Sequence, residues 1–503
     1  MSGPEEAASA NTPMRDFRAL GTLPAYSPGG GCGRLTDDES WVAHKKLNRR
    51  ASTPESADRR STAGHPTEDA EPTPATMRRS DARAKRREAF GPMRRLWSAL
   101  GPGVVSGAAD DDPSGIATYS IAGAQFGTAL LWTAFLTWPL MAAVQTMCAR
   151  IGMVTGRGLG AALRRKFPRP LLIAFAMSLF IANTINVGAD LAGMADVADL
   201  LTGFPAEAWV VLFGVGIAWA AIQLRYVVIA SALKWLALVL FAYVVTALII
   251  GPDWRSVVHD AFVPSLPPGR AGGQTLVAIL GTTISPYLFF WQASQEVEEE
   301  KALGRRRIAD RVGASTTEIR TRKLDVGVGT FFSNLVMFFI ILTTALTLHR
   351  HGLTQPATSR EVASALTPLA GRFAALLYSI GLIGTGALAI PTLAGSAAYA
   401  FAETFGWRQG IDEHFQRARG FYGLFVLSMA VGVCMEFAHV NPLKALYWTA
   451  VINGLLAPPL LLGILLAASD RRLMAGQPSS RLGRTVVGLT MVLMVGAAAS
   501  MLW

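Results

Sequence analysis

The chain has 503 residues, of which 51% are hydrophobic and only 16% are charged, and its formal net charge is +11. A soluble globular domain carries nearer a quarter of charged residues, so the composition excludes an ordinary soluble domain and favours a membrane protein. In a soluble protein the positive charge would suggest nucleic-acid binding, but here we assign the basic residues to loops on one side of a membrane.

Residues 1–95 are rich in Ser, Pro, Ala, Arg and Glu and have almost no apolar periodicity. Such a segment buries too little surface to offset its ordering entropy, so we predict a disordered cytoplasmic tail. It contains no apolar run followed by a cleavage site, so we predict no signal peptide. A start set too early, with Met77 or Met93 as the true start, and a small regulatory domain are the alternatives.

Residues 96–503 are predicted to form one all-α transmembrane domain. Uncharged stretches such as 128–149, 326–348 and 374–402 each exceed the ~20 apolar residues that cross a bilayer. Only helices satisfy so many buried backbone groups without the alternating pattern of a barrel. We expect eleven spans, at about 97–123, 128–150, 170–201, 206–223, 226–251, 272–299, 326–348, 371–403, 421–438, 443–468 and 484–503.

The basic loops predict the orientation of these spans. Lys and Arg collect in alternate loops, for example Arg157 to Lys166, Arg305 to Lys323 and Arg471 to Arg481, while the turns at 124–127, 202–205 and 439–442 have none. Because positive loops stay on the cytoplasmic side, we expect the N-terminus inside, the C-terminus outside, and an inner (plasma) membrane location.

The first span is interrupted by a proline and three acids. It reads Gly101 to Gly115 with Asp110, Asp111 and Asp112 directly before Pro113. A charge in mid-membrane is costly and therefore usually functional, and a proline removes a backbone hydrogen bond. We select Asp112 as the main acid of the site because it directly precedes the proline. For Asp110 and Asp111, attraction of cations and a passive vestibule position remain open.

The sixth span is interrupted in the same way by Pro286, within Gly281 to Tyr287. The two breaks fall at corresponding places in two five-span repeats, about 97–251 and 272–468, with 484–503 as an extra helix. Transporters built from inverted repeats bind substrate between two such unwound helices. Purely structural kinks and an ion channel are the alternatives.

A longer pattern follows the first break. It runs from Gly123 to Trp132 (GAQFGTALLW) and continues with Gln145 and Ala149 to Arg157 (ARIGMVTGR). This stretch closely resembles the second-span region of the NRAMP transporters, and the resemblance covers about 97–468. It implies a leucine-transporter-type fold, with a divalent metal ion bound between the first and sixth spans as the transported substrate.

The sequence departs from that family at the implied metal site. The family's Asp-Pro-Gly-Asn motif is matched by Asp112, Pro113, Ser114 and Gly115, and its Met-Pro-His motif by Ser285, Pro286 and Tyr287. The resemblance also implies main-chain oxygens of Ala109 and Thr282 as ligands. A tenth-span Gln is matched by Ala450, and Asn453, one turn further on, partly substitutes for it. We place Asp111 in the site beside Asp112.

These changes favour a particular kind of ion. Thioethers suit late transition metals, whereas carboxylate, carbonyl and water suit Mg²⁺, Ca²⁺ and Mn²⁺. Mg²⁺ usually keeps several waters, so a roomier site of oxygen ligands favours hydrated Mg²⁺ or Mn²⁺ over Fe²⁺. The chain is similar in this respect to the NRAMP-related magnesium transporters.

Proton coupling is predicted to be weakened or lost. Family members co-transport a proton with acids on the third span and His residues in the sixth. Here Met177, Thr184 and Val187 match the acidic positions, and Tyr287 and Gln292 match the His positions. None of these replacements titrates near neutral pH.

Two acidic features remain as candidates for the proton or cation pathway. Asp190, one turn from Val187, partly replaces the lost third-span acids. Glu296 opens an acidic run at the end of the sixth span, which either guides cations or is a solvated helix end.

Other functions fit less well. The seven His residues and the cysteines show no catalytic or metal spacing, so we expect no enzyme and no cofactor. A proton-coupled manganese or iron transporter and a non-transporting metal sensor on the same scaffold are the alternatives, and an organic-substrate carrier would not favour Asp112. The expected partners are the divalent ion and the lipid bilayer, not nucleic acid, and a monomer is sufficient.

Overall fold

The computed structural model describes residues 110–501 apart from 225–237, 412 and 439. By its internal contacts the chain divides into Met1–Ser80 and Asp81–Trp503, and every described residue belongs to the second unit. The disordered tail predicted for 1–95, the alternative starts and the proposed ligand Ala109 therefore lie outside the described residues.

The described part of the chain is helical and contains no strand. The long helices are α5 (Pro113–Phe126), α6 (Trp132–Thr155), α8 (Arg169–Thr202), α9 (Ala206–Gln223), α11 (Ala242–Ile250), α13 (Arg270–Thr283), α14 (Pro286–Ala302), α16 (Thr316–Thr347), α19 (Ala374–Phe405), α20 (Arg419–Glu436), α21 (Pro442–Ser469) and α22 (Arg481–Ser500). Shorter elements connect them: α7 (Leu159–Leu163), η1 (Leu238–Phe241), α12 (Trp254–Phe262), α15 (Ile308–Arg311), η2 (His349–His351), α17 (Ser359–Ala363), η3 (Ser364–Leu366), α18 (Thr367–Ala370) and η4 (Gly371–Phe373).

The all-α membrane architecture expected from the sequence is confirmed. Each predicted span contains helix in its described residues, and eight of the helical segments there are long and apolar enough to cross a membrane. The fourth span was predicted at 206–223, and α9 has the same bounds. The first and fifth spans are only partly described, so their full lengths are not part of this comparison.

The start of the seventh span was predicted wrongly. It was placed near residue 326, but α16 begins at Thr316, so Arg320, Arg322 and Lys323 lie in a helix and not in a loop. A capping box explains the earlier start: the Ser315 hydroxyl accepts from the Glu318 amide at 3.1 Å, and the Glu318 carboxylate accepts from the Ser315 amide at 2.8 Å. Two amides at the helix start are thereby satisfied, so the helix extends beyond its apolar part.

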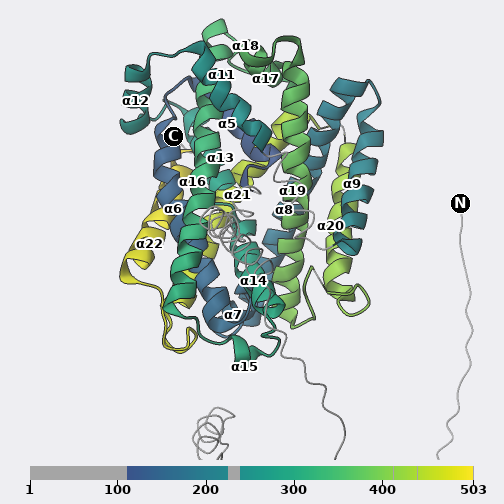
Figure 1. The fold of residues 1–503 in the computed structure, drawn as a ribbon, viewed down its shortest axis with the longest axis vertical. Coiled ribbons are helices and arrows are strands. Elements are labelled where there is room, and N and C mark those ends of the chain that lie inside the picture. The colour runs from purple at the N-terminus through teal and green to yellow at the C-terminus, as the bar shows by residue number, and fades with distance from the viewer. Residues whose placement is uncertain (1–109, 225–237, 412, 439, 502–503) are drawn as a thin grey trace, which may run out of the picture. The chain divides into compact units, whose positions relative to one another are not determined.

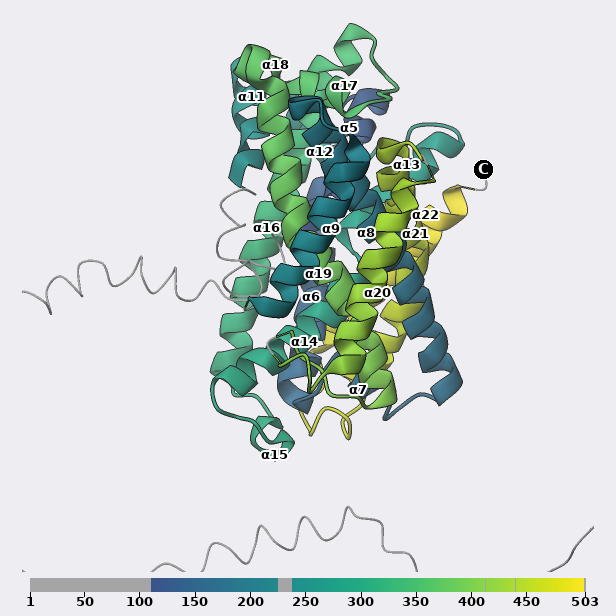
Figure 2. The ribbon, with the colours of Figure 1, turned by 90° about the vertical axis from the view of Figure 1, so that its right-hand side faces the viewer.

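Helix α8 is the central element of the packing. It contacts α19, α20, α21 and α9, and Figure 2 shows α9 and α20 side by side on one face. Helix α5 lies in the middle of the bundle, where it contacts α16, α13, α21, α8 and α19 (Figure 1). The resumed half of the first span is therefore enclosed by helices from both repeats.

The outer helices expose apolar side chains. In α9, Leu212, Val215 and Trp219 are 59–63% exposed, although the helix is as apolar as a buried one. Exposed apolar faces of this size on a helix long enough to cross a bilayer are expected to contact lipid. Helix α9 therefore marks the perimeter of the membrane domain.

Helices α13 and α21 approach each other at two glycines. A Cβ added at Gly281 would lie 2.0 Å from the Ala450 carbonyl oxygen, and one added at Gly454 would lie 2.5 Å from the Val277 carbonyl oxygen. Such close backbone contact is possible only without side chains. The first half of the sixth span is thus held tightly against α21.

The two ends of the membrane domain differ in charge. Helices α7 and α15 lie at the lower end in Figure 1, where the connecting segments carry Arg164, Arg165, Lys166 and the run Arg305, Arg306 and Arg307. We call this the basic end. Helix α22 starts at this end with Arg481, and Ser500 near its other end lies against Gly273 at the start of α13. The described C-terminal residues therefore lie at the end opposite the basic one.

Candidate functional site

The first helix break ends at Asp112. The backbone is not helical at Asp111 and Asp112, and α5 begins at Pro113 with Asp112 as its N-cap. The Asp112 Oδ1 atom accepts from the Gly115 amide and from the Ser114 hydroxyl, both at 2.7 Å. A proline suits the first helical position because its missing N–H would be unpaired there anyway. The break thus fixes a carboxylate, only 1% exposed, at the positive end of a helix.

Asn186 on α8 is the contact that sequence reasoning missed. Its side-chain Nδ2 donates to Asp112 Oδ2 at 3.2 Å, while its Oδ1 is buried and has no hydrogen-bond partner. The signal was a row of polar residues within an apolar span, since Asn183, Asn186 and Asp190 follow one another at spacings of three and four residues. Such spacings share one face of a helix.

The second break lies between α13 and α14, at Ile284 and Ser285. Pro286 is the first residue of α14, as Pro113 is of α5. The Ser285 hydroxyl does not cap α14; it donates back to the carbonyl oxygens of Gly281 at 2.8 Å and Thr282 at 2.6 Å. The Thr282 carbonyl, predicted as a metal ligand, therefore already accepts a hydrogen bond.

The two breaks meet at Gly115. A Cβ added there would lie 3.1 Å from Thr282 Oγ1 and 3.4 Å from Asp112 Oδ1. The Thr282 hydroxyl is buried and has no hydrogen-bond partner, and the nearby Tyr119 hydroxyl has none either. Unpaired buried polar atoms are uncommon because leaving one unsatisfied costs free energy. Their presence here indicates a place prepared for a polar ligand.

Asn453 adds a further unpaired group. It lies on α21, is 1% exposed, and neither its side-chain nitrogen nor its oxygen has a hydrogen-bond partner. Ala450, one turn earlier, is held against the backbone of α13 at Gly281. The same helix therefore carries a packing residue at the position matched to the family's Gln and an unpaired amide one turn away.

Asp190 on α8 is fully buried, and neither of its carboxylate oxygens has a hydrogen-bond partner. It lies close enough to Asp112 for the two charges to interact, and it also lies near Tyr287. The third-span acid and the main acid of the first break are thus brought into one region. We call this region, made of Asp112, Asn186, Asp190, Thr282, Ser285 and Asn453, the polar centre.

Asp110 and Asp111 take a different direction. The Ser333 hydroxyl on α16 contacts Asp110 Oδ2 at 2.7 Å and Asp111 Oδ1 at 3.1 Å. Both acids are at most 5% exposed. Asp111, placed in the metal site from the sequence, is therefore anchored to α16 through Ser333, whereas Asp112 is anchored to its own helix and to α8.

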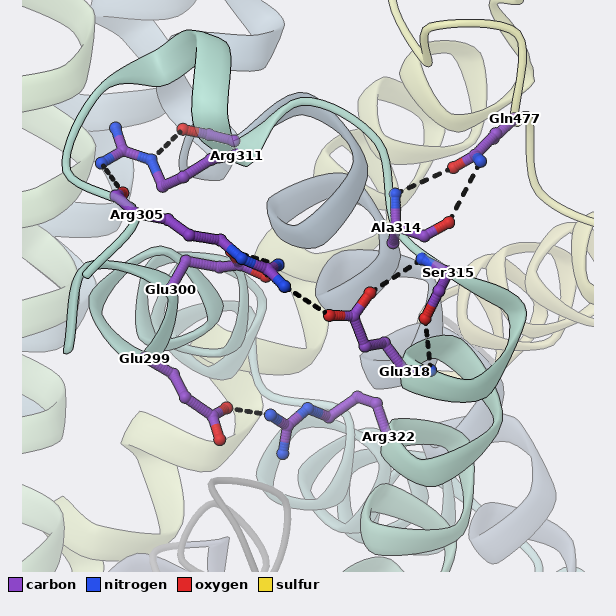
Figure 3. Close-up of polar contacts among 10 residues, drawn as sticks. Glu299, Glu300, Arg305, Arg311, Ala314, Ser315, Glu318, Arg322 and Gln477 are labelled. Atoms are coloured by element: carbon purple, nitrogen blue, oxygen red, sulfur yellow. Dashed lines mark hydrogen bonds and ion pairs between the residues drawn. The ribbon is translucent and has the colours of Figure 1, made fainter. Parts of the chain in front are cut away.

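Gln292 and Glu296 lie further along α14. Glu296 is ten residues beyond Pro286, about 15 Å at the rise of a helix. Gln292 donates to Glu296 at 2.8 Å, and Glu296 pairs with Arg322 of α16 at 2.8 Å. Arg322 also pairs with Asp325 at 2.6 Å and with Glu299, as Figure 3 shows for Glu299. We call Arg322, Glu296, Glu299 and Asp325 the Arg322 cluster.

The loop after α14 is tied down beside this cluster. In Figure 3, Arg305 reaches Glu300 at 2.8 Å and Glu318 at 2.9 Å, and Gln477 bonds the backbone of Ala314. The acidic run at the end of the sixth span is therefore mostly neutralised by arginines of the same end, as expected for a helix terminus fixed by ion pairs.

The polar centre is closed in this structure. Its residues are at most 1% exposed. A cavity of about 410 Å³ lies beyond the far end of α5, lined by residues such as Phe126, Asp253 and His349, and no residue of the polar centre lines it. Within the described part of the chain, no group of three or more His, Cys, Asp or Glu side chains is arranged to hold a metal ion. A cation here would depend on Asp112 together with neutral oxygens.

Fold and site together define a class: a multi-pass membrane protein with two interrupted helices, whose resumed halves start at prolines around a closed polar centre. Residues 103–503 match the sequence model of the family described as Natural resistance-associated macrophage protein-like (Nramp). The chain therefore belongs to the Nramp family, and the resemblance seen in the sequence is confirmed.

Similar proteins include two that are named divalent metal cation transporter MntH. The one from Deinococcus radiodurans is 27% identical over 313 residues, covering 60% of this chain and 69% of that protein. The one from Aeromonas hydrophila is 26% identical over 418 residues, covering 80% and 95%. Among solved structures, a manganese transporter from Eremococcus coleocola superposes with a TM-score of 0.62 at 17% identity, covering 80% of this chain and 86% of that one. That likeness supports the shared fold.

Proposed function

We propose that this chain is a secondary transporter that imports divalent metal cations across the inner membrane by alternating access, with the polar centre as its binding site. The observation that carries the proposal is the meeting of the two breaks: the Asp112 carboxylate and the unpaired Thr282 hydroxyl both border the space beside Gly115. Inverted-repeat transporters bind their ions between such broken helices. The names of the MntH relatives agree with this assignment.

The proposed substrate is Mg²⁺ or Mn²⁺. The groups gathered around Asp112 are oxygens of hydroxyl, amide and carboxylate groups, and Ser285 carries a hydroxyl at the second break. Oxygen ligands suit Mg²⁺ and Mn²⁺ better than softer metals. One carboxylate with neutral oxygens also fits an ion that keeps part of its water shell.

Uptake without protons is part of the proposal. Tyr287 and Gln292 occupy the positions matched to the family's His residues. A divalent cation gains ~4–5 kcal/mol from a potential of ~100 mV, which is enough to drive entry. Proton-coupled transport is a second candidate, because Asp190 is buried beside Asp112 without a hydrogen-bond partner and is suited to carry a proton.

The proposed orientation places the basic end in the cytoplasm. The segments there carry Arg164, Arg165, Lys166 and the arginines after α14, which are expected to remain on the cytoplasmic side. The described C-terminal residues then face the outside. We also propose that the protein is not an enzyme, has no cofactor and functions as a monomer, with 97–251 and 272–468 as its two repeats.

The test is uptake of Mg²⁺ and Mn²⁺ into proteoliposomes, with and without a pH gradient. We expect Mg²⁺ entry that ignores the pH gradient and that Asp112→Ala abolishes, while Asp470→Ala, a matched change at an exposed acid, leaves it intact. Entry of Mn²⁺ alone, with lumen acidification that Asp190→Asn removes, would favour the proton-coupled candidate. Binding without any uptake would overturn transport and favour a metal sensor.

A further inference from the structure

We propose that the Thr282 hydroxyl holds a water molecule of the hydrated cation in the space beside Gly115, which makes Thr282 a specificity-determining residue for ions that keep their water. This inference rests on the proposed function and names the way in which the site recognises its substrate. The space, bordered by Gly115, Thr282 Oγ1 and Asp112 Oδ1, is called the Gly115 notch below.

The first observation is the state of the Thr282 side chain. It is 1% exposed, and its hydroxyl has no hydrogen-bond partner although it lies close to Asp112 and Tyr119. Its backbone carbonyl already accepts from the Ser285 hydroxyl at 2.6 Å. The hydroxyl, and not the carbonyl, is therefore the Thr282 group with unused hydrogen-bonding capacity. A hydroxyl has two acceptor positions for this purpose.

The second observation is the notch itself. An added Cβ at Gly115 would lie 3.1 Å from Thr282 Oγ1, 3.4 Å from Asp112 Oδ1 and 3.4 Å from Tyr119 Cε2. Any side chain at this position would therefore fill the space in front of the hydroxyl. Gly115 has an ordinary helical environment in α5 and no positive φ, so its backbone does not require glycine. The absence of a side chain serves the space and not the backbone.

The charges place the cation next to the notch. Asp112 Oδ1 already accepts two hydrogen bonds, from Ser114 and Gly115, whereas Oδ2 accepts one, from Asn186. Oδ2 is therefore the oxygen with more capacity for the cation. A water bound to that cation is a strong donor, because the ion polarises it. In the notch it donates to Thr282 Oγ1.

This arrangement discriminates by hydration. Mg²⁺ gives up water reluctantly and usually remains bound to several waters. An ion that keeps its water uses the Thr282 hydroxyl, while one that sheds that water gains nothing from it. Loss of the hydroxyl therefore acts more strongly on Mg²⁺ than on an ion that enters the site with fewer waters.

Three substitutions test the inference. Thr282→Val replaces the hydroxyl by a methyl group of the same shape; because that hydroxyl is unpaired, the change should not destabilise the fold. Thr282→Ser keeps the hydroxyl and is the matched control. Gly115→Ala fills the notch, and Gly216→Ala on α9, where an added Cβ meets no atom within 4 Å, controls for the glycine-to-alanine change.

The measurement is the KM for Mg²⁺ and for Mn²⁺ in proteoliposomes of the full chain. We expect Thr282→Val and Gly115→Ala to raise the KM for Mg²⁺ by roughly tenfold, the equivalent of one hydrogen bond to a charged group, and the KM for Mn²⁺ by less. Thr282→Ser and Gly216→Ala should match the parent protein. An unchanged ratio of the two KM values in Thr282→Val would overturn the inference.

Failure of the proposed function is recognised separately. In that case the parent protein shows no uptake that depends on Asp112. Titration of the detergent-solubilised protein with MgCl₂ then decides the role of Thr282: weaker binding in Thr282→Val but not in Thr282→Ser supports the notch, and equal binding in both overturns it.

Discussion

The polar centre and the Arg322 cluster both bury acidic side chains between helices, but they satisfy them differently. In the Arg322 cluster, one guanidinium pairs with Glu296, Glu299 and Asp325, so the negative charges have a partner within the protein. In the polar centre, Asp190, Thr282 and Asn453 have atoms without a hydrogen-bond partner. The difference separates a cluster that holds helices together from a site that awaits a ligand.

The largest expected effect is on stability, at the Arg322 cluster. Arg322→Met leaves Glu296 and Asp325 buried without their cation, so we expect the free energy of unfolding to fall by about 3 kcal/mol. Chemical denaturation of the detergent-solubilised protein measures this change. Arg306→Met, at an exposed arginine of the same loop, is the control and should have little effect.

The cluster also has an internal check. Glu296→Gln combined with Arg322→Met removes one of the stranded charges and should recover part of the lost stability. If Arg322→Met unfolds like the parent protein, the ion pairs are not structural and the contrast between the two regions fails.

The second effect separates function from stability, at Asn453. Asn453→Leu removes two unpaired buried atoms, so stability should stay the same or rise by about 1 kcal/mol, while uptake should fall roughly tenfold if the amide faces the ion. Asn334→Leu is the matched control. That side chain accepts from Thr137 at 2.6 Å and donates to the Thr330 carbonyl at 2.8 Å. Its loss should destabilise the fold, and a stable Asn334→Leu would contradict this reasoning.

The smallest effect concerns an exposed ion pair at the basic end. Lys166 donates to Asp470 at 2.8 Å, and this hydrogen bond lowers the pKa of Asp470 to about 2. Because the pKa is depressed in the folded state, the contribution is present above the ordinary value of 3.8 and is lost as the pH falls toward 2. An exposed pair is worth little, so Lys166→Met should change the free energy of unfolding at pH 7 by less than about 0.5 kcal/mol.

A larger loss in Lys166→Met would show that exposure does not decide the strength of ion pairs at this end. The denaturation curves of Lys166→Met and the parent protein should converge below pH 4 if the lowered pKa of Asp470 is the cause.

Much of the fold was predictable because a membrane imposes strong local rules. Uncharged runs gave the spans, and Pro113 and Pro286 gave both breaks, since a proline removes a backbone hydrogen bond wherever it occurs. The start of α16 was missed because hydropathy does not detect a capping box, although Ser315 and Glu318 stand at the required spacing.

The candidate site was only partly predictable. Asp112 was found because a mid-membrane acid is conspicuous, but Asn186 depends on how α8 packs against α5, which no local pattern gives. The role of Thr282 was assigned to its carbonyl, and only the position of the Ser285 hydroxyl shows that this oxygen is engaged. Contacts between distant helices decide which atom of a residue faces a ligand.

The close approach of α13 and α21 divides the sixth span into two mechanical parts. Gly281 and Gly454 leave no room for sliding between these helices, while α14, beyond the break, packs against α6 and α19. A pair of spectroscopic labels on α13 and α21 is therefore expected to keep a constant separation through the transport cycle. That pair supplies an internal ruler against which the movement of α14 can be read in a single molecule.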